Sequence, residues 1–326
     1  MTRATAILMG FLFLAIGGGA AAQPAHWQGQ WPNTDFTMHS VPFEEILSGG
    51  PPKDGIPAID EPRFRPHAEV TDIAPTEPVI GLVIGGEARA YPLRILMWHE
   101  IVNDEIGGVP VAVTFCPLCN TALVFDRRLD GDVLDFGTTG KLRNSDLVMY
   151  DRQSESWWQQ FTGEAIVGRM TGKQLRILPS RLESFARFVE RAPDGQVLVP
   201  NGRHDRAYGF NPYEGYDSRP APYEFFKGDL PVEVAPLARI VAVGEEAWSL
   251  DHLRSVGQLT TADGVEVSWT PGQNSALDSR AIGEGVDVGN VVARRRVGDG
   301  WEDVPYRLDF AFAWRAFHPD RPIVNR

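Results

Sequence analysis

Short strand-like runs separated by glycine-containing turns are the feature that most constrains the fold of this chain. Residues 79–84 form one such run, and a Gly85-Gly86 turn leads into a second at residues 88–91, as in a β-hairpin. Residues 109–115 and 121–136 continue the pattern, with Asp130-Gly131 typical of a hairpin turn. The sequence therefore predicts an α+β protein that is mostly β.

Two short helices interrupt this predicted series of strands. Pro92 suits the first turn of a helix that continues through Leu93, Leu96 and Met97. A second helix is predicted over residues 182–191, with Leu182, Phe185, Phe188 and Val189 on one face.

The chain also contains a diverged internal repeat. Residues 86–93 resemble 244–250, residues 120–123 resemble 274–277, and residues 182–194 resemble 308–320. This pattern predicts two diverged β-rich repeat units, each with a short helix. The second copy has Pro271-Gly272-Gln273 where the first has two cysteines, and it lacks counterparts of residues 98–100 and 149–160.

These patterns predict five segments. Residues 1–22 resemble a signal peptide, and residues 23–78 form a Pro- and Gly-rich extended arm. Residues 79–200 are the first repeat unit, which carries the reactive residues. Residues 201–232 are a linker with four prolines, and residues 233–326 are the second, degenerate unit.

The N-terminus predicts export from the cytoplasm. Arg3 precedes an apolar run at residues 7–16 and a small-residue stretch that ends at Ala22. Ten apolar residues are too few for a membrane span, which needs about twenty. We therefore expect cleavage near Ala22, a periplasmic or secreted mature protein and no stable membrane insertion. A formal charge of −12 argues against a nucleic-acid partner.

Cys116 and Cys119 are the only cysteines of the chain, and a Cys-x-x-Cys spacing separates them. Three interpretations stay open: a structural disulfide, a metal site and a redox-active pair. The loop that such a disulfide would close is very small, so it would stabilise the fold little. Strands are expected on both sides of the motif, unlike the long helix that follows it in a thioredoxin.

His99 is the predicted third ligand, because the helix that it ends leads into the strand before the cysteines. Two thiolates and an imidazole suit copper or zinc, and the Met149 thioether would favour copper. The alternatives are a hydrogen-bonded surface histidine and a core methionine. The prediction is copper before zinc, with Cys116, Cys119, His99 and Met149 as ligands.

Residues 151–160 place charged, hydroxyl, amide and indole groups close together in the sequence. With Glu100, the residues Asp151, Arg152, Trp158 and Gln159 could form a pocket wall or surround the metal ligands. The alternative is that Trp158 fills the core while Asp151 and Arg152 pair at a turn.

Four strings carry a resemblance to a known family: residues 90–92, 98–104, 115–122 and 149–159, the last containing Met149-Tyr150-Asp151-Arg152 and Ser156-Trp157-Trp158-Gln159. From Gly85 to about Val199 the chain resembles a family of exported bacterial proteins catalogued as a domain of unknown function. The resemblance implies export and no defined activity.

The leading functional hypothesis is an exported metal-binding protein that holds copper, or zinc in second place, with metal-dependent oxidoreductase activity left open. One alternative is a periplasmic thiol-disulfide oxidoreductase with Cys116 as nucleophile. Another is a ligand-binding module in which the cysteines form a structural disulfide. The expected partner is an unidentified small molecule or a metal-delivery protein.

Overall fold

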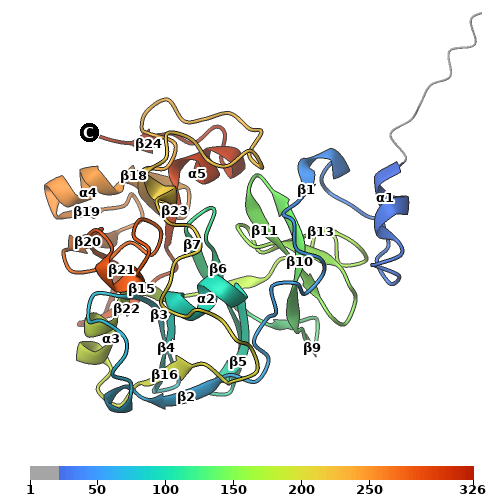
Figure 1. Cartoon of the computed structure of the whole chain (residues 1–326). Coiled ribbons are helices and arrows are strands. Elements are labelled where there is room, and N and C mark those ends of the chain that lie inside the picture. The colour runs from blue at the N-terminus through green and yellow to red at the C-terminus, as the bar shows by residue number, and fades with distance from the viewer. Residues whose placement is uncertain (1–21) are drawn as a thin grey trace, which may run out of the picture.

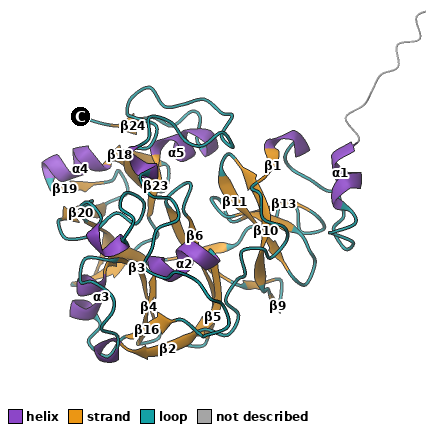
Figure 2. Ribbon diagram, in the orientation of Figure 1, coloured by secondary structure: helices purple, strands orange, loops and turns teal. Residues whose placement is uncertain are grey.

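The structure is a computed structural model, and it describes residues 22–326 (Figure 1). The predicted signal peptide therefore lies outside the described residues, apart from its last position. The chain is mostly β, as predicted, with several small sheets and short helices between them (Figure 2). Within residues 22–326, no helix has the length and apolar character needed to cross a membrane.

The first unit consists of hairpins joined by short helices. The predicted hairpin around Gly85-Gly86 is confirmed, because β3 pairs with β4 in antiparallel register, and β5 pairs with β6 in the same way. The elements are β3 (Pro78–Ile84), β4 (Glu87–Pro92), α2 (Leu93–His99), β5 (Ile101–Ile106), β6 (Val109–Cys116), β7 (Thr121–Asp126), β14 (Arg176–Leu178), β15 (Arg181–Ser184), α3 (Phe185–Arg191) and β16 (Gln196–Val199).

The second unit repeats this order of elements. It contains β17 (Arg239–Val243), β18 (Glu246–Ser249), α4 (Leu250–Val256), β19 (Gln258–Thr260), β20 (Val265–Thr270), η4 (Ile282–Glu284), β21 (Asn290–Val297), β22 (Gly300–Asp303), β23 (Arg307–Phe310), α5 (Ala311–Phe317) and β24 (Ile323–Val324).

The sheets of the two units have corresponding strand orders. One sheet runs β15-β3-β4-β16 in the first unit and β23-β17-β18-β24 in the second. A second sheet runs β5-β6-β7-β14 and β19-β20-β21-β22, respectively. The two units thus share a topology, while descent from a duplicated sequence stays a prediction.

An additional sheet interrupts the first unit between β7 and β14. Its order is β1-β10-β11-β12-β13, and it lies to the right in Figure 1. The segment contains β8 (Arg128–Leu129), β9 (Asp132–Val133), β10 (Phe136–Arg143), β11 (Asp146–Asp151), β12 (Trp157–Gln159) and β13 (Glu164–Val167). The second unit passes directly from β21 to β22, so it has no counterpart of this sheet.

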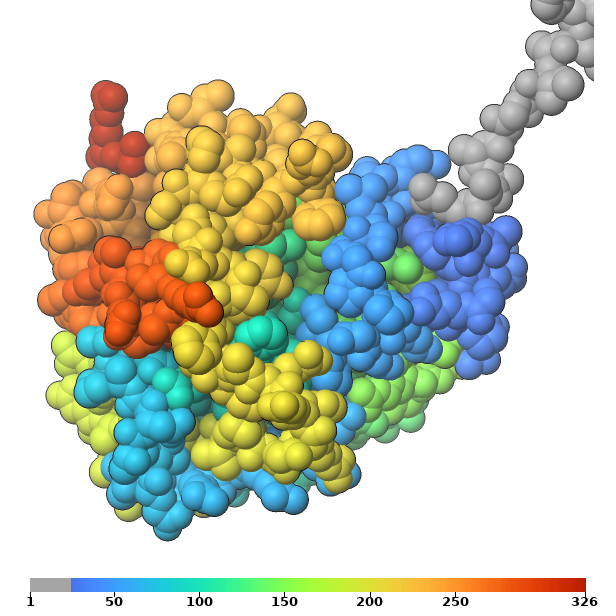
Figure 3. Space-filling view, in the orientation of Figure 1, coloured from blue at the N-terminus to red at the C-terminus, as the bar shows by residue number. Residues whose placement is uncertain are grey.

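The N-terminal arm contributes edge strands to the sheets of the first unit. Its elements are α1 (Ala22–Trp27), η1 (Phe43–Glu45), β1 (Ile46–Ser48), β2 (Arg63–Pro66) and η2 (His67–Glu69). β1 pairs with β10, and β2 pairs with β16. The linker holds only η3 (Tyr216–Ser218), and its yellow residues cross the face of the molecule in Figure 3.

The predicted helix over residues 182–191 starts three residues later than expected. Leu182 belongs to β15, where it pairs with Ile80, and α3 begins at Phe185. Ser184 ends the strand because its side chain accepts a hydrogen bond from the Arg187 amide and caps the helix.

One hydrophobic core joins the two units. The largest buried cluster includes Phe115 and Trp158 from the first unit together with Val241 and Phe310 from the second. β7 packs beside β23, and β15 packs beside β21. The turn that carries the cysteines, just before β7, therefore lies beside a strand from the far end of the chain.

Candidate functional site

The two cysteines lie on a tight turn between antiparallel strands, as the sequence predicted. Cys116 ends β6 and pairs with Thr121, the first residue of β7. The turn is closed by a hydrogen bond from the Asn120 amide to the Pro117 carbonyl, 3.3 Å, and Asn120 adopts a φ of 54°. Asparagine tolerates this left-handed conformation better than most residues. Both cysteines are free thiols in this structure.

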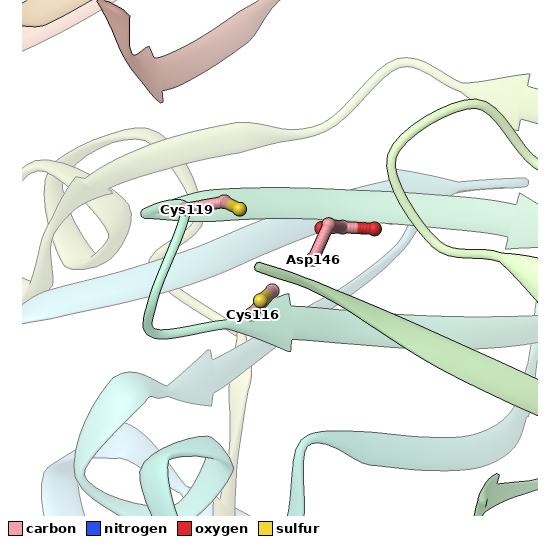
Figure 4. Close-up of side chains that lie close together, drawn as sticks. All are labelled: Cys116, Cys119 and Asp146. Atoms are coloured by element: carbon pink, nitrogen blue, oxygen red, sulfur yellow. The ribbon is translucent and has the colours of Figure 1, made fainter. Parts of the chain in front are cut away.

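Asp146 joins the two thiols from the additional sheet (Figure 4). The Asn144-Ser145 turn, with φ values of 54° and 62°, brings it in at the start of β11. The two Sγ atoms and one Asp146 carboxylate oxygen all lie within 4.8 Å of one another. Within residues 22–326, no other His, Cys, Asp and Glu side chains form such a group of three or more.

Gln159 and the backbone hold the Asp146 carboxylate in place. Oδ1 accepts hydrogen bonds from Gln159 Nε2 at 2.6 Å and from the Phe161 amide at 2.8 Å. The second oxygen, Oδ2, is buried and has no hydrogen-bond partner in the described part of the chain. One oxygen of Asp146 is therefore fixed, while the other stays available to a ligand.

Further buried polar atoms near this group lack a partner among residues 22–326. They are Ser145 Oγ, Gln159 Oε1, Gln160 Oε1 and Arg307 Nη2. Gln159 contacts Asp146, and Gln160 donates to Thr114 Oγ1 and to the Thr121 carbonyl. Native proteins leave few buried polar atoms without a hydrogen-bond partner. Several such atoms close together therefore indicate a site that binds a polar group.

Burial dominates the electrostatics of the site. Both thiols are almost inaccessible, with 1% of Cys116 and none of Cys119 exposed. Burial raises the pKa of Cys116, and a hydrogen bond with Cys119 partly offsets this rise. Burial also raises the pKa of Cys119, by more than that of Cys116. Burial also raises the pKa of Asp146 to about 7, against the hydrogen bonds from Gln159 and Phe161.

Glu100 carries a second buried carboxyl group close to this site. It caps the C-terminus of α2 and is 8% exposed. Burial, together with the negative charge of Asp146, raises the pKa of Glu100 to about 8.

The second unit holds the turn that carries the cysteines. The Phe310 amide donates to the Cys119 carbonyl at 2.9 Å, and Asn120 Nδ2 donates to the Leu308 carbonyl at 3.0 Å. Thr121 Oγ1 donates to Asp309 Oδ1 at 2.7 Å. β23 thus fixes the end of the motif that leads into β7.

The linker covers the same turn from another side. The Tyr216 hydroxyl donates to the Leu118 carbonyl at 3.0 Å, and the Tyr216 ring stacks on Tyr223. These contacts help to keep solvent away from the thiols.

His99 does not join the cysteines in this structure, contrary to the expected ligand set. Its ring Nδ1 contacts the Pro57 carbonyl and its Nε2 contacts the Tyr208 hydroxyl, both at 2.7 Å. The helix does end at His99 as predicted, but partners from the arm and the linker occupy both ring nitrogens. Asp146 stands in the place that the prediction assigned to this imidazole.

Met149 and Asp151, two other predicted site residues, have structural roles. Met149 is fully buried in the main core, where it pairs with Thr138 and Trp158. Asp151 accepts hydrogen bonds from the Ser154 amide and hydroxyl and from Trp158 Nε1, so it orders the turn before the buried Trp158.

Arg152 faces the surface, and Gln159 faces the site. Arg152 pairs with Asp60 at 2.5 Å beside a groove of about 330 Å³ that also borders His204. Gln159 was expected to surround the ligands, and it does contact one of the three clustered residues, because its side chain donates to Asp146.

Asp146 is the ligand candidate that sequence reasoning missed. Asn144-Ser145 marks a turn, but nothing in the local pattern shows that the following aspartate is buried beside the cysteines. Asp309 and Arg307 were also missed, because they lie about 190 residues after the motif.

Comparisons with known proteins place the chain in a family. No curated protein and no solved structure matches it. A family model described as a protein of unknown function (DUF3179) matches residues 53–321, which include both units and the site. The chain therefore belongs to this family of proteins of unknown function, DUF3179.

Proposed function

We propose that this chain is an exported metal-binding protein whose ion is held by Cys116, Cys119 and Asp146. The observation that carries the proposal is the convergence of two thiols and a carboxylate within 4.8 Å, with one buried carboxylate oxygen unpartnered in the described residues. Leaving such a group unpaired in the interior is costly, and a bound cation would compensate for that cost.

The spacing of the three side chains is compatible with ligation of one ion. Zinc binds thiolate sulfur at about 2.3 Å and carboxylate oxygen at about 2.0–2.2 Å, which places neighbouring ligand atoms about 3.5–3.8 Å apart. The three ligand atoms lie within 4.8 Å of one another, so the side chains have to move together only a little to reach these separations.

The donor set favours zinc over copper. The His99 imidazole suits copper and zinc alike, and the preference for copper rested on the soft Met149 thioether. In their place the group offers a carboxylate oxygen, a hard donor that suits a divalent ion better than Cu(I). We therefore place zinc first and copper second.

Burial argues against a thiol-disulfide oxidoreductase. A thiol that exchanges with a partner protein has to be accessible, and its pKa is lowered by a helix N-terminus or a nearby cation. Cys116 and Cys119 are buried, their pKa values are raised, and a strand follows the motif. These features support a metal site more than redox exchange.

Export is part of the proposal. The N-terminal charge, apolar run and small-residue stretch support cleavage near Ala22 and a periplasmic or secreted mature protein. In an oxidising compartment, a metal bound to both thiolates would protect them from oxidation. A metal-delivery partner would then load the site.

The test is elemental analysis of the mature protein purified from the periplasm, with three variants. We expect about one zinc or copper ion per chain, lost in Cys116→Ser and in Asp146→Asn. His99→Ala is the control, because both of its ring nitrogens face protein groups. Wild-type protein that binds neither metal, even after reconstitution under reducing conditions, would refute the proposal.

A further inference from the structure

Glu100 has a backbone conformation that normally belongs to glycine. It follows the last residue of α2 with φ 58° and ψ −33°, and its amide donates to the Leu96 carbonyl at 2.7 Å. A positive φ is uncommon for residues with a Cβ, and such strain collects where function requires it. Glycine is the usual residue at this position of a helix end.

The second unit supplies an internal comparison. In that unit Gly257 follows the last residue of α4, with φ 74° and ψ −36°. This is nearly the backbone conformation of Glu100. The Phe115 amide donates to the Glu100 carbonyl at 2.8 Å, and the Trp269 amide donates to the Gly257 carbonyl at 2.9 Å. The two positions are therefore equivalent in topology, and the unit without cysteines uses glycine where the unit with cysteines keeps a strained glutamate.

The position of Glu100 places it beside the site. Its backbone lies opposite Phe115, the residue that precedes Cys116 on β6. More than nine-tenths of Glu100 is buried. Glu100 is close enough to the site for its charge to raise the pKa of Cys116 and for the charge of Asp146 to raise the pKa of Glu100. Buried charges in proteins are paired or coordinate metals, so a buried carboxyl group beside two thiols is a candidate ligand.

We propose that Glu100 is the fourth ligand of the metal, and that it closes a site of two thiolates and two carboxylates. This inference rests on the proposed function. In this structure the Glu100 carboxylate lies outside the group that Asp146 forms with the two thiols, so its side chain has to rotate toward the thiols when the metal binds. Four protein ligands would make the site closed, as in structural or storage sites, and not open to water as in catalytic ones.

Cobalt(II) is the probe, because its visible spectrum reports coordination number and thiolate ligation. The full mature chain is titrated with Co(II) under reducing conditions, alongside Glu100→Gln and Glu100→Gly. The matched control is Glu105→Gln, an exposed glutamate on β5. We expect a four-coordinate spectrum for wild type and the control, and at least about tenfold weaker binding with an altered spectrum for both Glu100 variants.

Urea unfolding of the metal-free proteins separates a ligand from a structural residue. Because glycine fits the backbone without strain, Glu100→Gly should unfold at a urea concentration at least as high as wild type. A lower midpoint with unchanged Co(II) affinity would refute the inference, and so would Glu100 variants with the wild-type spectrum. In both cases the three-ligand site stands, whereas a wild type that binds no Co(II) would overturn the proposed function as well.

Discussion

The contact between Asp309 and the cysteine turn yields a prediction of how strongly the second unit supports the site. Asp309 is completely buried on β23. Its carboxylate accepts hydrogen bonds from Thr121 Oγ1 at 2.7 Å and from Arg307 Nε at 2.8 Å. The Arg307 side chain is only 13% exposed, so water does not screen this ion pair effectively.

Replacing Asp309 with asparagine keeps the shape of the side chain and removes its charge. Breaking a buried pair by removing one partner costs about 3–5 kcal/mol, because the other charge stays buried without compensation. Arg307 still contacts the Phe161 carbonyl and ring in the variant. We therefore expect the lower end, about 3 kcal/mol of unfolding free energy.

The assay is equilibrium urea unfolding of the mature protein with chelator present, followed by tryptophan fluorescence. Asp303→Asn is the matched control, because Asp303 pairs with Arg181 at 2.6 Å with both side chains partly exposed, 22% and 32%. Such a pair contributes about 1 kcal/mol or less. If Asp309→Asn loses no more stability than Asp303→Asn, the argument from burial is wrong.

Two further predictions concern protonation and the cover over the thiols. Since burial and the charge of Asp146 raise the pKa of Glu100 from 4.5 to about 8, the folded protein keeps a proton there that the unfolded chain releases. With chelator present, the unfolding free energy should therefore fall by at most about 5 kcal/mol as the pH rises between those two values. The fall should be smaller in Glu100→Gln, and the same dependence of unfolding free energy on pH in both proteins would contradict this prediction. Tyr216→Phe removes the hydrogen bond to the Leu118 carbonyl, at a cost of about 1 kcal/mol, and should expose the thiols to iodoacetamide. Tyr306→Phe is the control, because it loses a similar hydrogen bond to the Val291 carbonyl. If the cysteines of Tyr216→Phe are alkylated no faster than those of this control, the linker does not shield them.

Local sequence patterns were sufficient for the strands and for the turn that carries the cysteines. Apolar runs and Gly-containing turns define the β3–β4 and β5–β6 hairpins, because hairpin pairing depends on neighbouring residues. The same reasoning located the end of α2 at His99 and the turn at Asp130-Gly131 between β8 and β9.

Tertiary contacts decided which side chains meet at the site. The direction of the His99 ring depends on Pro57 and Tyr208, 42 and 109 residues away along the chain. Asp146 meets the cysteines because the additional sheet folds back onto β6 and β7, and no local pattern encodes that approach. Asp309 is 188 residues from Thr121, the residue it contacts.

The division has a physical basis. Period-2 patterning, turn residues and helix caps act over a few residues, so the sequence alone determined the mostly-β fold and the position of the Cys-x-x-Cys turn. The orientation and electrostatic environment of a buried polar side chain depend on whichever distant groups pack against it. Only the tertiary structure could therefore show that Asp146, and not His99, lies beside the thiols.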